Sequence, residues 1–67
     1  MKVWDLIDAY GVGGRGADVE IRKSDANSTI VEETTTKTTY IKHGEDEVSL
    51  FRIGLNNKLI IFLAEEN

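Results

Sequence analysis

The chain has 67 residues, of which 40% are hydrophobic and 30% charged, with no cysteine, no proline and a formal net charge of −4. This length allows one domain over residues 1–67, and the absence of cysteine excludes a disulfide framework. The acidic balance argues against direct binding to nucleic acid, because a phosphate backbone requires a basic surface.

No apolar segment of the sequence approaches the roughly 20 residues that a membrane-spanning helix needs. Asp5 lies where a signal peptide would have its apolar centre. We therefore expect a soluble cytoplasmic protein that has no membrane partner.

Residues 3–10 have the spacing of a short amphipathic helix. The apolar residues on one stripe of a 3.6-residue period are Val3, Leu6, Ile7 and Tyr10. Gly11 is a typical residue just past a helix C-terminus. Because a helix this short is unstable alone in water, it must pack on another element.

Residues 11–16 match the string G-x-G-x-x-G. In dinucleotide-binding proteins this string follows a strand and begins a helix, so that the helix N-terminus faces the pyrophosphate. Here the expected order is reversed, with a helix before the glycines and a strand after them. We therefore expect a connecting loop and no cofactor.

The next segments have the patterns of a β-hairpin. Residues 17–23 alternate between apolar and polar side chains, which is typical of a strand with one buried face. Residues 24–28 are mostly short polar residues that favour a turn. A second strand is expected to follow this turn.

Residues 29–42 contain no glycine or proline, and five threonines lie between positions 34 and 39. Such β-branched residues favour a strand. One straight strand over this range would span about 46 Å, at about 3.3 Å per residue, which is too long for so small a domain. We expect either one strand that bends near Thr34–Thr36 or two strands that share a bulge.

The C-terminal part of the chain is the most apolar. Residues 48–53 have apolar side chains on both faces of a predicted strand, and residues 54–57 favour a turn. Residues 59–64 are apolar without interruption, and Lys58 and Glu65-Glu66 flank them. A run of this length without a polar face indicates a buried central strand.

Together these patterns predict an α+β fold, in which a short N-terminal helix packs on a curved antiparallel sheet of four or five strands. One helix covers only one face of the apolar strand at 58–64. Its second face therefore requires sheet curvature, a partner or a second copy of the chain, and the last option is a homodimer.

The sequence contains few residues suited to catalysis or metal binding. His43 is the one histidine, and no serine lies in a nucleophile-elbow pattern. A zinc site needs several Cys or His ligands. Asp25 begins a segment similar to a calcium loop, but positions six and twelve hold Ile30 and Thr36 instead of glycine and glutamate. We expect no catalytic residue, no metal and no enzymatic activity.

The acidic residues are the candidates for binding a partner. Carboxylates spaced along a sheet face can imitate a phosphate array and engage a nucleic-acid-binding protein. The alternatives are an ordinary solvated surface, because charged residues are normally exposed, and an apolar binding surface. The candidate residues are Asp18, Glu20, Glu32, Glu33, Glu45, Asp46 and Glu47.

Val3-x-x-Leu6-Ile7-x-Ala9 and Ala17-Asp18-Val19-Glu20-Ile21 together resemble the start of many small orphan proteins of bacteriophages and mobile elements. That group includes anti-CRISPR inhibitors and other counter-defence proteins. The resemblance implies a non-enzymatic inhibitor in the host cytoplasm, which binds a host protein or complex and blocks its nucleic-acid or assembly surface. The alternative is a structural or assembly module, such as a small phage or oligomer-forming protein, that completes its sheet with another chain.

Overall fold

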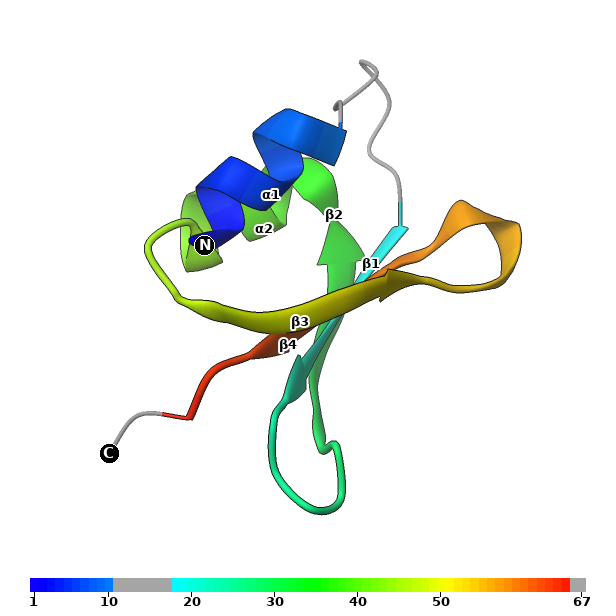
Figure 1. The fold of residues 1–67 in the computed structure, drawn as a ribbon. Helices are drawn as coiled ribbons and strands as arrows, with labels where there is room; N and C mark the ends of the chain where they lie inside the picture. The colour runs from blue at the N-terminus through cyan, green and yellow to red at the C-terminus, as the bar shows by residue number, and fades with distance from the viewer. Residues whose placement is uncertain (11–17, 66–67) are drawn as a thin grey trace.

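The computed structural model describes residues 1–10 and 18–65 (Figure 1). The glycine string at 11–16 lies outside the described residues. The elements in chain order are α1 (Val3–Tyr10), β1 (Asp18–Lys23), β2 (Ile30–Thr35), α2 (Thr36–His43), β3 (Val48–Ile53), the 3₁₀ turn η1 (Leu55–Asn57) and β4 (Leu59–Leu63). The predicted helix at 3–10 and strand at 48–53 are confirmed, and the strand predicted at 17–23 is found as β1 from Asp18 to Lys23. The glycine string also lies between a helix and a strand as predicted, which is the reverse of the dinucleotide-binding order.

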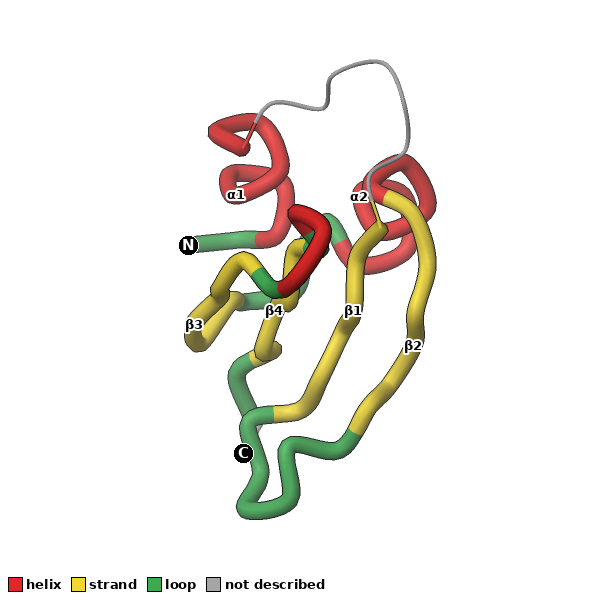
Figure 2. The backbone as a smooth tube through the Cα atoms, turned by 90° about the vertical axis from the view of Figure 1, so that its right-hand side faces the viewer, coloured by secondary structure: helices red, strands yellow, loops and turns green. Residues whose placement is uncertain are grey.

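The four strands form one mixed sheet in the order β2-β1-β4-β3 (Figure 2). β4 is a central strand, as predicted, but it pairs with β1 in parallel. The outer pairs, β1 with β2 and β4 with β3, are antiparallel. The prediction of a purely antiparallel sheet was therefore wrong, and the sheet has no clear curvature.

The two helices lie side by side on one side of the sheet (Figures 1 and 2). The main core is the layer between α1 and the two central strands. Its fully or almost fully buried side chains are Val3, Leu6, Ile7, Val19, Ile21, Leu59 and Ile61. Alternation along β1 and β4 places their odd-numbered residues on this helix-facing side, which we call the helix face.

Residues 36–43 form helix α2, so the strand predicted over the second half of 29–42 was wrong. Thr35 caps the helix, because its Oγ1 accepts a hydrogen bond from the Thr38 backbone N–H at 3.3 Å. One turn later the Thr39 hydroxyl donates to the Thr35 carbonyl at 2.8 Å. The threonines thus bond locally to the backbone, which is how they come to begin a helix rather than extend a strand.

Helix α2 is also held by α1. The Trp4 indole Nε1–H donates to the Tyr40 carbonyl at 3.0 Å, and the two rings lie 6.2 Å apart. The first backbone N–H groups of α1 donate to the loop after α2, Val3 to Asp46 at 3.0 Å and Trp4 to Gly44 at 3.1 Å. Donors that a helix leaves unpaired at its start are thereby satisfied. These contacts between α1 and the α2 region stabilise the helix by more than the low helix propensity of its threonines costs.

The face of the sheet opposite the helices, which we call the open face, is covered by long charged side chains. Phe62 lies on this face and is only 7% exposed. The guanidinium of Arg52 lies 5.3 Å from the centre of its ring, a cation–π contact. Arg22 lies opposite Phe62 in the register with β1. The second face of β4 therefore obtains cover within this chain, and the homodimer argument from an uncovered β4 does not hold.

Gly44 allows α1 and α2 to approach, and Gly44→Ala tests this contact. An added Cβ would lie 1.6 Å from Trp4 Nε1, so the ring would have to leave the Tyr40 carbonyl. We expect the free energy of unfolding to fall by about 1–3 kcal/mol, measured by urea denaturation followed by circular dichroism. Gly54→Ala is the matched control, because its nearest atom is the flexible end of Ile60 at 3.0 Å. Equal losses in the two variants would contradict the proposed role of Gly44.

Candidate functional site

The acidic residues predicted to bind a partner do not form one array. Five of the seven are paired with a cation or with His43, and these are Glu20, Glu32, Glu33, Asp46 and Glu47. Asp18 and Glu45 are exposed and form no ion pair within the described residues. The carboxylates therefore serve mainly to join segments of this chain.

Glu20 is the most buried of these carboxylates and lies on the open face. Its side chain is 9% exposed and pairs with Arg22 and with Lys58, whose Nζ lies 3.5 Å away. Lys58 also donates to Glu33 at 3.1 Å, so its ammonium reduces the repulsion between two carboxylates that stand opposite each other in the register. The hydrogen bond from Arg22 holds the pKa of Glu20 below its usual value, against the opposing effect of burial.

His43 ties the end of α2 to β2 and to the loop at 44–47. Its Nδ1 lies 3.0 Å from Asp46 Oδ2, and its Nε2 lies 3.2 Å from Glu32 Oε2. Lys42 donates to the other oxygen of Glu32 at 2.8 Å, and this bond, followed by the one to His43, lowers the pKa of Glu32. Both ring nitrogens face carboxylates, so neither faces a serine hydroxyl. His43 is therefore a structural tie.

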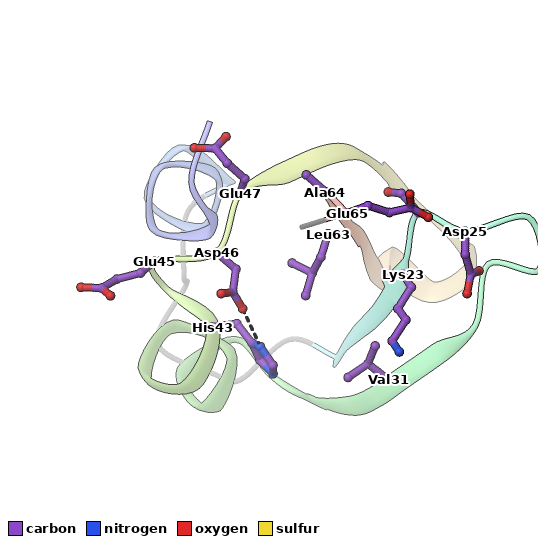
Figure 3. Close-up of a pocket in the computed structure, with 11 residues that line it drawn as sticks. Lys23, Asp25, Val31, His43, Glu45, Asp46, Glu47, Leu63, Ala64 and Glu65 are labelled. Atoms are coloured by element: carbon purple, nitrogen blue, oxygen red, sulfur yellow. Dashed lines mark hydrogen bonds and ion pairs between the residues drawn. The ribbon is translucent and has the colours of Figure 1, made fainter. Parts of the chain in front are cut away.

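An open depression of about 760 Å³ lies between the end of α2 and the β1–β2 hairpin. Figure 3 shows His43 and Asp46 facing each other on one side of it, with Leu63 near its middle. The side chains of Glu45 and Glu47 point away from it (Figure 3). Within the described residues no group of three or more potential ligands is placed to hold a metal ion.

The segment that resembles the start of a calcium loop is a hairpin turn. The Asp25 carboxylate accepts hydrogen bonds from the Thr29 backbone N–H at 3.0 Å and from its hydroxyl at 2.9 Å. These bonds lower the pKa of Asp25. Arg22 donates to the carbonyl of Ser28 at 2.7 Å, and Ser28 itself has a positive φ of 48°. The oxygens of this turn thus accept hydrogen bonds from groups of the same chain.

The outer edge of β3 is a feature that the sequence did not reveal. The Gly54 N–H donates to the Lys58 carbonyl at 2.7 Å, which is one of the two bonds of a hydrogen-bonded antiparallel pair, while the Lys58 N–H donates to the Leu55 carbonyl at 3.2 Å. Such pairs alternate along a ladder, so the backbone groups of Arg52 face β4. The backbone groups of Phe51 and Ile53 therefore point away from β4, where no strand lies within the described part of the chain.

The start of the same edge is already covered. The Val48 N–H donates to the Met1 carbonyl at 2.8 Å, and Lys2 forms a β-bridge with Glu47. The Met1 ammonium pairs with the Glu47 carboxylate at 3.0 Å. The N-terminal residues thus protect the edge as far as Val48, and the open part begins beyond it.

Apolar side chains gather along this open edge. Leu50 is 52% exposed and lies on the open face, whereas Phe51 at 43% and Ile53 at 48% lie on the helix face. Leu55, just after the strand, is 90% exposed. Arg52 is the one charged residue of β3. Natural free edges usually carry charges, prolines or covering segments, whereas this edge carries four exposed apolar residues.

No protein-family model, no curated protein and no solved structure matches this chain. The resemblance of its opening to small phage and mobile-element proteins therefore stays a prediction. None of the described helices combines the length and the apolar character needed to cross a bilayer.

The ion pairs of Glu20 predict a specific dependence of stability on pH. The pKa of Glu20 is lowered by folding, so its stabilisation is complete above the usual glutamate pKa of about 4.3 and is lost as the pH falls through the lowered value. We expect Glu20→Gln to be less stable than the parent protein near neutral pH and to lose less stability in acid. Urea denaturation at several pH values measures both effects.

Glu45→Gln is the control for this experiment, because Glu45 is exposed and forms no ion pair within the described residues. We expect this variant to follow the parent protein at every pH. Equal losses of stability in acid for Glu20→Gln and the parent protein would show that the Glu20 ion pairs do not contribute.

Proposed function

We propose that this chain is a non-enzymatic protein-binding module that takes a strand of a partner chain beside β3. The supporting observation is the outer edge of β3, where the backbone groups of Phe51 and Ile53 point away from β4. In binding by strand addition, main-chain hydrogen bonds provide affinity and alternate side chains provide specificity.

The side chains of this edge define what the added strand should carry. On the helix face it meets Phe51 and Ile53, so apolar or aromatic residues there gain the energy of cross-strand pairs. On the open face it meets Leu50 and Arg52. We therefore expect the partner to provide an apolar strand that has no lysine or arginine opposite Arg52.

An inhibitor of a host nucleic-acid-binding complex, as expected for a phage counter-defence protein, is one setting for such a module. An assembly protein that completes its sheet with another chain is the other. The ion pairs within the chain weigh against imitation of a phosphate array, because five of the seven candidate carboxylates already have a partner. The apolar edge of β3 is therefore the better candidate surface in both settings.

Affinity capture from a lysate of the host cell, followed by mass spectrometry, tests this proposal with three variants. Phe51→Lys places a charge on the open edge, and we expect it to lose the protein recovered by the parent chain. Val31→Lys is the matched control on the opposite edge strand, where Val31 is similarly exposed at 43%, and it should keep that protein. Glu45→Lys should also keep it.

Two other results would contradict the proposal that β3 binds the partner. Loss of the partner with Glu45→Lys, but not with Phe51→Lys, would place the binding surface at the loop 44–47. Recovery of the same proteins with the parent chain and with Phe51→Lys would contradict strand addition at β3. Circular dichroism of each variant shows that it is folded.

A further inference from the structure

We propose that the strand added beside β3 is β3 of a second copy of this chain, in an antiparallel register centred on Phe51. This inference rests on the proposed function, because it names the partner of the same edge. The two four-stranded sheets would then join into one continuous sheet, with a two-fold axis perpendicular to it.

The charges on the two edge strands favour β3 over β2 for such pairing. In a symmetric pair the central residue lies opposite its own copy. In the middle of β2 the central residue would be Glu32 or Glu33, and like charges directly opposite each other are destabilising. In β3 the central residue Phe51 would meet the same aromatic ring of the other copy.

The backbone of β3 selects the register. With a two-fold axis perpendicular to the sheet, both copies keep their helices on the same side, so opposite residues must share a face. Centring on Phe51 places it in a hydrogen-bonded pair with itself, because its N–H and C=O point outward in both copies. In this register Leu50 lies opposite Arg52, so no like charges meet.

The two neighbouring registers are disfavoured by named residues. Centring on Arg52 would place the two guanidinium groups opposite each other. Centring on Leu50 would place Arg52 of one copy beside Val48 of the other, where Met1 already accepts the Val48 N–H. The register centred on Phe51 keeps the guanidinium groups apart, and its last strand residue, Ile53, lies opposite Ser49, short of the segment that Met1 covers.

The same register brings further apolar side chains together. It places Ile53, the last residue of β3, opposite Ser49 of the other copy, at the β-bulge between Val48 and Leu50, and the chain that follows, with Leu55, then runs toward Met1 of the second copy. Leu55 is 90% exposed and Met1 58% exposed in the single chain. The edge is thus self-complementary in charge, hydrogen bonding and apolar contact, which is the reason for choosing a second copy rather than an unrelated protein as the occupant.

Analytical ultracentrifugation of the full chain tests the inference through residue 51. We expect the parent protein to sediment as a dimer at micromolar concentration. Phe51→Lys and Phe51→Glu should each sediment as monomers, because residue 51 lies opposite itself and each variant then opposes like charges. An equimolar mixture of the two should recover the dimer, because lysine then faces glutamate.

Val31→Lys is the control on the other edge and should remain dimeric. Phe51 is 43% exposed, so its replacement leaves the core intact, and Ile53→Lys provides a second edge variant that should also be monomeric. A parent protein that stays monomeric up to millimolar concentration would overturn the inference, as would a dimer that survives Phe51→Lys. Failure of the mixture to dimerise would overturn the register.

The outcomes also separate this inference from the proposed function. A monomeric parent protein whose captured partner is lost on Phe51→Lys would refute the homodimer and support binding of a different chain at β3. If Phe51→Lys changes neither the sedimentation of the protein nor the partner that it captures, both proposals are refuted.

Discussion

The parallel pairing of β1 with β4 is the constraint on which the rest of the fold depends. It brings four aliphatic side chains to the face of the sheet on which the helices lie, where they are completely buried. These are Val19, Ile21, Leu59 and Ile61. Parallel strands cannot be joined by a tight turn and need a crossover. In this chain β2, α2 and β3 lie between them in sequence, which leaves β2 and β3 as the two edges.

Local sequence patterns predicted the elements better than their pairing. The periodicity of α1 and the alternation of β1 reflect contacts with one buried face, so both could be read directly. The unbroken apolar run of β4 correctly indicated a buried central strand, and such runs are typical of parallel pairing, but the run does not identify the neighbouring strand, and an antiparallel sheet was predicted. Helix α2 could not be predicted in this way, because the indole of Trp4 that bonds to Tyr40 is remote in sequence.

The prediction of the candidate site was also limited by contacts between residues that are remote in sequence. Exposed acidic residues were a reasonable prediction from composition, but strand order brings Lys58, just before β4, within reach of Glu20 on β1 and Glu33 on β2, so that it pairs with both. The apolar character of β3 on both faces was visible in the sequence. Its position at an edge was not, because that position follows from the pairing of β1 with β4.

The central parallel pair also divides the sheet into two local hairpins, β1 with β2 and β3 with β4. Each hairpin joins strands that are near in sequence, whereas the parallel pair joins Val19 to Leu59. Contacts between distant residues slow folding, because loop-closure entropy is lost before they form. We expect docking of the two hairpins to set the folding rate. During synthesis, the apolar strand β4 would then stay uncovered on its β1 side until this step, with Lys58 at its start as the charged residue that opposes aggregation.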